Sequence, residues 1–475
     1  MLNKLNIKQA REGLKSKKFS SVELTKECLD RIKQTDDKLN VFVTLTEEEA
    51  LKNAEKADST LASQGETLEA MPLLGIPIAI KDNFSTNGIR TTASAKVLDD
   101  YIPSFDSTVV KKLKEAGMVL LGKTNMDAWA HGSSTETSDY GPTLNPWNIE
   151  HLPGGSSGGS AASVAANQCI AAIGSETAGS LRQPASWCGV VGLKPTYGRV
   201  SRYGVVAMGS SLDSPGPITK TVEDSALILK VLAGRDEMDA TTSPSPVLDY
   251  ASKLNLDIKN LVIGISDEYF IDVDEEVSDA VKQAIAKLEK MGAKIETIKL
   301  FDPKYAIDVY TIIQRSEVSS NLARYDGIRY GNDRSFFREE AKRRIMFGTH
   351  ALSSGYYDQY YNKASKVRSV IIEDFRKAFE KVSVIIAPTS PSLALPVGST
   401  KDQSMFGELA DVLVEPSSIA GLSGINIPVG FSESNLPIGM QIIGPQFAEE
   451  IVIQTAHKYE QETLGEDWRK LEPSV

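Results

Sequence analysis

The amino-acid sequence predicts an α/β fold, in which a single large mixed sheet is covered by helices. The chain has 475 residues, of which 41% are hydrophobic and 24% are charged, so it can bury a large core. Short apolar runs recur along the chain, and amphipathic segments separate them. This alternation is typical of layered α/β proteins.

The first elements of the chain are expected to be helices. The segment from Ser20 to Glu23 has the sequence of a capping box, and apolar residues follow it at helical spacing, which predicts a helix to about Gln34. A second helix is expected to begin near Thr46. We therefore expect a helical N-terminal region over residues 1–65 and one continuous core over 66–475, because no repeat or long Pro/Ser linker interrupts the rest.

The later elements follow from pattern and length. Short apolar runs predict buried strands at 76–80, 118–121, 170–173, 261–265, 384–387, 425–429 and 438–443. Amphipathic segments predict helices at 107–116, 222–233, 276–290, 354–379 and 449–460. The segment 241–246 has only the signals of a short loop.

Charge and cysteine content exclude several classes of protein. The 52 Lys and Arg against 63 Asp and Glu give a net charge of −11, the wrong sign for a protein that grips a phosphate backbone by itself. The cysteines Cys28, Cys169 and Cys188 suggest neither a disulfide framework nor a metal site, and they fit a reducing cytoplasm. No run of about 18 apolar residues suggests a membrane span, and the first residues do not resemble a signal peptide.

Two nucleotide-binding patterns are rejected on their context. The letters from Gly117 to Thr124 match a P-loop, but a helix-like segment precedes them and their interior is an apolar strand, which reverses the required order. The sequence Ala79-Ile80-Lys81 resembles the lysine strand of protein kinases, but the other kinase motifs do not occur.

Two Gly/Ser-rich segments, PGGSSGGS at 153–160 and GSETAGSLRQP at 174–184, are the most informative motifs. The first also matches the nucleophile elbow of α/β-hydrolases, which would need a histidine further along the chain. Only His350 and His457 qualify, and we expect both to be structural. Because helix-forming or stiffer residues follow each segment, a backbone cradle for an anion is favoured over a flexible linker.

Three blocks in order resemble the amidase signature family: GIPIAIKDN at 75–83, PGGSSGGSAA at 153–162 and GSETAGSLRQPA at 174–185. Further blocks at 190–204, 319–331 and 342–358 resemble the branch formed by the A subunits of glutamyl-tRNA(Gln)/aspartyl-tRNA(Asn) amidotransferases. The resemblance covers nearly the whole chain. It implies an amidase signature domain over 66–475, with a single large mixed sheet.

The resemblance implies a Ser-Ser-Lys triad, with Ser180 as nucleophile, Ser156 as the bridging serine after a cis peptide, and Lys81 as base. A lysine can act as a base only when it is unprotonated, and burial can lower its pKa by up to about 3 to 5 units. The apolar strand before Lys81 could supply that burial. We expect Asp82 to lie on the opposite face of the strand, away from the amine.

The implied reaction is attack on the side-chain amide of glutamine, with loss of ammonia and hydrolysis of the glutamyl-enzyme by water. The resemblance assigns the oxyanion to the backbone N–H groups of Thr177, Ala178, Gly179 and Ser180. It assigns the substrate carboxylate to Arg344 and the amino group to Asp411, with Tyr310 and Gly132 alongside. No metal ligands are expected.

The resemblance also implies partners. The ammonia would pass to the B subunit, which would use ATP and Mg²⁺ to amidate a misacylated Glu-tRNA(Gln) or Asp-tRNA(Asn), and a small C subunit would complete the complex. No cofactor is expected in this chain. A free-standing amidase for a small amide and a noncatalytic module with the same fold remain as alternatives.

Two residues depart from the family pattern. Ala178 occupies a position where many members have glycine, so a positive φ there would store about 1 to 2 kcal/mol of strain. His131 occupies a position that is usually apolar, near the substrate loop. We expect it to have a packing role, since a lysine already fills the position of the base.

Overall fold

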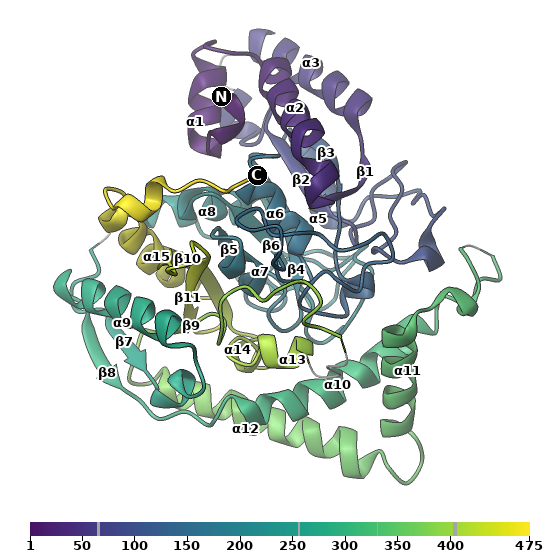
Figure 1. Cartoon of the computed structure of the whole chain (residues 1–475), viewed down its shortest axis with the longest axis vertical. Helices are drawn as coiled ribbons and strands as arrows, with labels where there is room; N and C mark the ends of the chain where they lie inside the picture. Colours follow the sequence, from purple (N-terminus) through teal and green to yellow (C-terminus); the bar gives the residue numbers. More distant parts are fainter. Residues whose placement is uncertain (64–66, 255–256, 330, 402–405) are drawn as a thin grey trace.

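A mixed sheet runs through the centre of the molecule in the computed structural model, which describes residues 1–63, 67–254, 257–329, 331–401 and 406–475 (Figure 1). Within those residues the sheet has eleven strands in the order β1-β3-β2-β4-β6-β5-β10-β11-β9-β7-β8. Their bounds are β1 Phe42–Leu45, β2 Pro77–Lys81, β3 Val119–Thr124, β4 Ala171–Glu176, β5 Val191–Lys194, β6 Ser214–Thr219, β7 Val262–Ile265, β8 Lys294–Thr297, β9 Val384–Pro388, β10 Ser423–Phe431 and β11 Pro437–Gly444. The predicted fold class is confirmed.

The strand directions bring the carboxyl ends of β2 and β4 together. β3, β2 and β4 are parallel to one another, and the strands from β4 through β9 are antiparallel. β2 ends at Lys81 and its neighbour β4 ends at Glu176. Because the carboxyl ends of parallel neighbours share one edge of a sheet, Lys81 lies beside the turn that follows β4.

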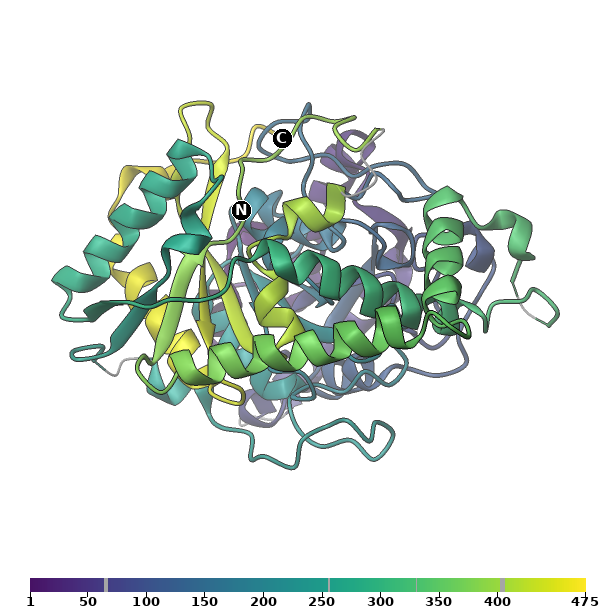
Figure 2. The same cartoon turned by 90° about the horizontal axis from the view of Figure 1, so that it is seen from below.

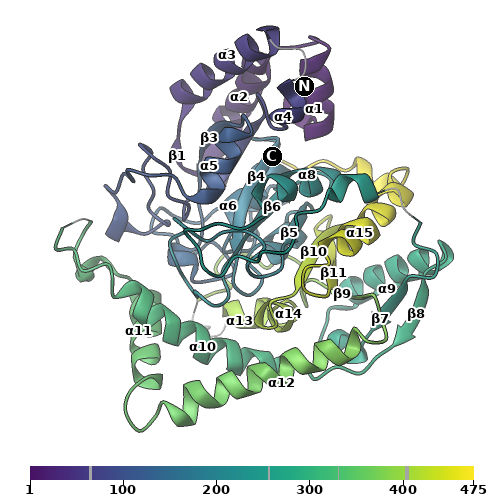
Figure 3. The same ribbon diagram turned by 180° about the vertical axis from the view of Figure 1, so that it is seen from behind.

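Helices cover the sheet and extend beyond it at both ends (Figure 1). Their bounds are α1 Ile7–Lys15, α2 Ser21–Leu39, α3 Glu47–Ser63, α4 Thr67–Ala70, α5 Thr108–Glu115, α6 Gly158–Ala165, α7 Arg182–Trp187, α8 Val222–Leu232, α9 Glu275–Lys290, α10 Lys304–Leu322, α11 Glu339–Ala351, α12 Lys363–Ala378, α13 Phe406–Ala410, α14 Glu415–Ile419 and α15 Glu449–Thr463. Figure 2 shows α10 and α12 side by side, and Figure 3 shows α15 against β10 and β11. No helix in the described ranges is long and apolar enough to cross a bilayer.

The helix predicted from the capping box is confirmed, and strand β1 also lies in this region. Ser20 and Glu23 form a full capping box at the start of α2. The helix runs to Leu39, beyond the expected Gln34, and ends where Asn40 takes a left-handed conformation. The proposed boundary at residues 65 and 66 lies outside the described residues, so the division into 1–65 and 66–475 stays a prediction.

Several other predictions are confirmed, with one correction. The segment that matches a P-loop in spelling is a turn at Gly117 with φ of 90° followed by β3, and α5 precedes it, which is the expected helix-turn-strand order. The helix predicted at 354–379 is shorter. Gly355 has a φ of 87°, a π-helical turn occupies Asp358–Asn362, and α12 begins only at Lys363.

Candidate active site

Lys81 lies at the carboxyl end of β2, and its amine is buried inside the protein with three hydrogen-bond partners. Its Nζ donates hydrogen bonds to Ser156 Oγ at 2.8 Å, to Ser157 Oγ at 2.8 Å and to the carbonyl oxygen of Ser175 at 3.1 Å. The side chain is fully buried, with 0% of its surface exposed. The structure therefore joins β2, the first Gly/Ser turn and the end of β4 through one amine.

Burial determines the protonation of this amine. Loss of hydration lowers the pKa of Lys81 from 10.5 to about 7, although the charges of Asp127, Asp213 and Glu176 act in the opposite direction. Asp82 accepts from the backbone N–H groups of Thr92 and Ser94 at 3.0 and 3.2 Å. As expected from strand alternation, its carboxylate is thus held on the other side of β2.

The first Gly/Ser turn places Ser156 beside the amine. The peptide bond between Gly155 and Ser156 is cis. The N–H of Gly155 donates to Gln183 Oε1 at 2.9 Å, and a Cβ on Gly155 would lie 2.1 Å from Asp127 Oδ2, so no side chain fits there. The N–H of Ser157 donates to the carbonyl oxygen of Ser180 at 3.2 Å, which ties the first turn directly to the second.

The second turn is held by a buried ion pair. Glu176 Oε2 accepts from the N–H groups of Leu181 and Arg182 at 3.0 and 3.1 Å, and Glu176 Oε1 lies 2.6 Å from Arg182 Nη2. Both side chains are fully buried. Arg182 Nη2 also donates to Val414 O at 3.0 Å, and Ser418 Oγ donates to Glu176 Oε1 at 3.0 Å, so α14 and the residue before it support the turn.

The backbone between these anchors presents free donors. In the described part of the chain, no internal acceptor faces the N–H groups of Thr177, Ala178, Gly179 or Ser180. Since these residues are buried, and buried N–H groups in proteins are nearly always paired, the arrangement suits a bound negatively charged oxygen. Ala178 does not have a positive φ, so the strain considered for it does not arise.

Tyr310, Arg344, Asp411 and Gly132 come from four segments that meet near this turn. Tyr310 on α10 shares a hydrogen bond of 3.1 Å with Thr177 Oγ1. A Cβ added to Gly179 would lie 2.3 Å from Asp411 Oδ1. Asp411 Oδ2 accepts from Ser133 Oγ at 2.7 Å, which places the next residue after Gly132 against Asp411.

Arg344 on α11 is positioned by side chains on three segments. It donates to Gln314 Oε1 at 2.9 Å and to Glu340 Oε1 at 2.6 Å, and Glu408 Oε1 lies 3.8 Å from its Nη2. Burial opposes the charge, but the carboxylates of Glu408 and Glu340 raise its pKa above the ordinary value. These bonds use two of the five guanidinium N–H groups, which leaves donors for a carboxylate.

The structure also reveals residues that were not predicted. Glu176, Arg182 and Ser418 hold the second turn, while Gln314, Glu408 and Glu415 surround Arg344 and Asp411. Glu176 and Arg182 lie within the second Gly/Ser-rich segment, and their charges in an otherwise uncharged stretch were the available signal. The others lie on α10 and in the 407–419 segment, whose sequences carry no motif that marks them.

The histidines lie apart from the triad. His131 is buried, and burial together with the charges of Arg344 and Arg315 lowers its pKa well below 6.5, so it is neutral at neutral pH. His350 packs against the ring of Tyr356, with 4.3 Å between centroids, and His457 Nδ1 lies 3.6 Å from Glu460 Oε2. Within the described ranges, no hydrogen bond joins any of the three to Ser156 or Ser180.

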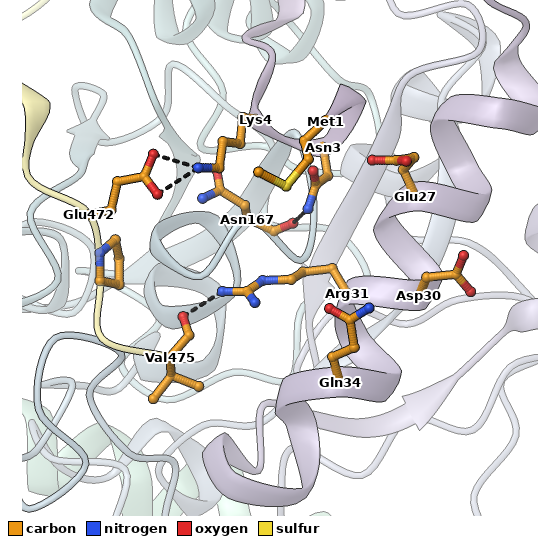
Figure 4. A pocket seen from close by; sticks show the side chains of 11 residues that line it. Met1, Asn3, Lys4, Glu27, Asp30, Arg31, Gln34, Asn167, Glu472 and Val475 are labelled. Atoms are coloured by element: carbon orange, nitrogen blue, oxygen red, sulfur yellow. Dashed lines mark hydrogen bonds and ion pairs between the residues drawn. The ribbon is translucent and has the colours of Figure 1, made fainter.

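A surface pocket between the two chain ends is separate from these residues (Figure 4). Three of its charged groups are already paired: Lys4 binds Glu472, and Arg31 donates to the carbonyl oxygen of Val475. None of the predicted site residues lines it.

Comparisons with known proteins point to one family. The family model Amidase matches residues 23–453. The A subunit of the glutamyl-tRNA(Gln) amidotransferase of Carboxydothermus hydrogenoformans is 50% identical, over 99% of this chain and 99% of the relative. The crystal structure of the protein of the same name from Thermotoga maritima has 42% identity and a TM-score of 0.80, covering 96% of this chain and 94% of that one. A peptide amidase from Stenotrophomonas maltophilia has 28% identity and a TM-score of 0.83, covering 96% of each chain.

Proposed function

Because the chain belongs to the amidase signature family, we propose that it is the glutaminase subunit of a tRNA-dependent amidotransferase, releasing ammonia from glutamine. The observation that carries the chemistry is the fully buried amine of Lys81, 2.8 Å from Ser156 Oγ. The likeness to A subunits over nearly the full chain supports the choice of glutamine.

The chemical steps assign one role to each member of the triad. Ser180 Oγ attacks the side-chain amide carbon of glutamine, while its proton passes to Ser156, whose own proton passes to the neutral amine of Lys81. The new C–O bond leaves a negative oxygen, which the N–H groups of residues 177–180 bind. The proton then returns through Ser156 to the amide nitrogen, the C–N bond breaks, and ammonia leaves. Water hydrolyses the glutamyl ester by the same route and releases glutamate.

The amino acid part of the substrate binds in the region around Arg344. The free guanidinium donors bind the α-carboxylate, and Asp411 Oδ1 accepts from the α-ammonium. Tyr310 links this region to the oxyanion turn through Thr177. Gly132 precedes Ser133, which contacts Asp411, and a Cβ added to Gly132 would lie 2.6 Å from Asp127 Oδ1.

The released ammonia is used by a partner subunit within a complex. The B subunit uses ATP and Mg²⁺ to activate Glu-tRNA(Gln) or Asp-tRNA(Asn) and receives the ammonia, and a C subunit completes the heterotrimer in the cytoplasm. The likeness to chains named as the A subunits of such enzymes supports this assembly. The net charge of −11 agrees with tRNA binding by a partner rather than by this chain.

The test is glutaminase activity of the purified chain, alone and with the B and C subunits, compared with Ser180→Ala. The parent is expected to release ammonia from glutamine. In Ser180→Ala, the rate of ammonia release should fall at least about 1,000-fold. Ser186→Ala, at a buried serine on α7 that follows the segment, is the matched control and should retain activity. Equal ammonia release by Ser180→Ala and parent would refute the nucleophile assignment.

Substrate choice separates the two alternatives. A free-standing amidase would hydrolyse simple amides better than glutamine and would not copurify with two further subunits. A noncatalytic module would release ammonia from neither.

A further inference from the structure

Three carboxylates share one side of the segment that leads into α14. The N–H of Asp411 donates to Gly407 O at 3.1 Å, and the N–H of Glu415 donates to Asp411 O at 2.9 Å, so the segment has helical hydrogen bonds through this stretch. Residues three and four positions apart on a helix are neighbours. Glu408, Asp411 and Glu415 therefore form an acidic stripe on one face.

The stripe is buried, and one of its members, Glu415, has no hydrogen-bond partner for either carboxylate oxygen among the described residues. Glu408, Asp411 and Glu415 are 2%, 3% and 0% exposed. Glu408 Oε1 accepts from Arg315 at 3.0 Å, and Asp411 Oδ2 accepts from Ser133. Among the described residues, both oxygens of Glu415 and Oδ1 of Asp411 have no hydrogen-bond partner. Leaving a buried polar group unpaired costs about 1 to 3 kcal/mol, and more for a charge.

The position of Glu415 connects it to the substrate region. Its helix, α14, packs against α10, which supplies Tyr310 and Gln314. The residue before it contacts the oxyanion turn, since a Cβ on Gly179 would lie 2.5 Å from Val414 Cγ2. Burial and the charges of Glu408 and Asp411 raise the pKa of Glu415 well above its ordinary value, while the charge of Arg344 acts in the opposite direction. Glu415 thus belongs to the same charge cluster as the two residues assigned to the amino acid backbone of glutamine.

We propose that Glu415 is a second carboxylate for the α-ammonium group of the substrate, which it binds together with Asp411. The inference rests on the proposed glutaminase function and adds a specificity residue to it. An ammonium group has three N–H donors, and Asp411 Oδ1 with the two oxygens of Glu415 offers three acceptors. A cation between them also removes the repulsion between the two carboxylates.

The test compares glutamine with glutaramate, which keeps the amide and the carboxylate but has no amino group. In the complete complex, Glu415→Gln is expected to raise KM for glutamine about tenfold and to change kcat less than about twofold, because only substrate binding is weakened. Its kcat/KM for glutaramate should equal that of the parent. Glu433→Gln, at an exposed glutamate, is the matched control and should leave the kinetic constants for both substrates unchanged.

A second variant tests the inference even if Glu415→Gln fails to fold, and a binding measurement complements it. Glu415→Asp keeps the charge on a shorter side chain, so it should recover part of the preference for glutamine over glutaramate. The affinities of glutamine and glutaramate for Ser180→Ala protein, with and without Glu415→Gln, measure the same preference without turnover.

Two results would overturn the inference: equal losses on both substrates, which indicate a structural role, or no change in the preference for glutamine. If the parent releases no ammonia from glutamine at all, the proposed function itself fails, and this outcome is distinct from both.

Discussion

At the scale of single residues, the site depends on a lysine whose pKa is lowered to about 7 by its surroundings. Lys81 Nζ has three hydrogen-bond partners; the neutral amine donates to two of them and accepts from a serine O–H through its lone pair. Within the described residues, no carboxylate lies close enough to form an ion pair with it. Burial is then the largest influence on its pKa and makes the neutral form available near pH 7. A histidine is not needed as the base.

The pH dependence of glutamine hydrolysis follows from this amine. Below its pKa of about 7, Lys81 is protonated and cannot accept the proton, so kcat/KM should fall about tenfold per pH unit on the acid side. Above that pH the rate should level off. Steady-state kinetics from about pH 5 to 9 measure the midpoint, and a midpoint near the ordinary carboxylate range of about 4 to 5 would indicate a carboxylate base instead.

At the scale of elements, the oxyanion turn is a short connection held from both sides. The Glu176–Arg182 pair supports it from within, and the start of α14 packs against it. Gly179 faces Asp411 and Val414 at distances that no side chain tolerates.

We expect Gly179→Ala to disable the turn while the fold survives. The new Cβ would lie 2.3 Å from Asp411 Oδ1, so the turn must move, and its N–H groups would no longer point toward the oxyanion. Removing one oxyanion donor costs about 2.7 to 4 kcal/mol in another serine hydrolase, so a loss of at least about 100-fold in kcat is expected. Gly465→Ala is the control, because nothing among the described residues lies within 4 Å of its added Cβ. Kinetics and circular dichroism together test this, and normal kcat in Gly179→Ala would contradict it.

The buried ion pair should matter for stability as well as shape. Arg182→Met leaves the carboxylate of Glu176 buried without its partner, which typically costs about 3 to 5 kcal/mol. Chemical denaturation measures the loss. The double variant Arg182→Met, Glu176→Gln should recover part of it, and a full loss in the double variant would show that packing dominates.

At the scale of the whole molecule, the N-terminal helices share the main core. Ile7 on α1 and Leu24 and Ile32 on α2 belong to the same buried cluster as the strands β2, β3 and β4. The N–H of Ile7 also donates to the buried carboxylate of Asp224 on α8 at 3.0 Å. A second cluster lies under α10, α11 and α12, next to the substrate region.

Leu24→Ala should therefore lower the stability of the whole chain. Truncation of a buried leucine costs about 2 to 5 kcal/mol, and a shared core predicts that the main unfolding transition shifts to lower temperature. Lys26→Ala on the exposed side of α2 is the control. Scanning calorimetry distinguishes this from an independent N-terminal unit, which would unfold in a separate earlier transition.

The elements that were not predicted share physical causes. Strands β1, β5 and β8 have only four residues, and β6 contains Pro215 and Pro217, so their patterns are weak. Helix α10 is buried on most sides and carries polar residues such as Gln314 toward the site, which obscures its amphipathic period.

The sequence by itself determined the fold class, the order of the main strands and helices, and the motifs that contain Lys81, Ser156 and Ser180, because local patterns and short motifs encode these. Tertiary structure alone decided how the amine of Lys81 loses its charge and which side chains gather around Arg344. Glu340, Glu408 and Glu415 meet there from two segments far apart in the chain. Long-range packing sets burial and electrostatics, so no local pattern could have predicted them.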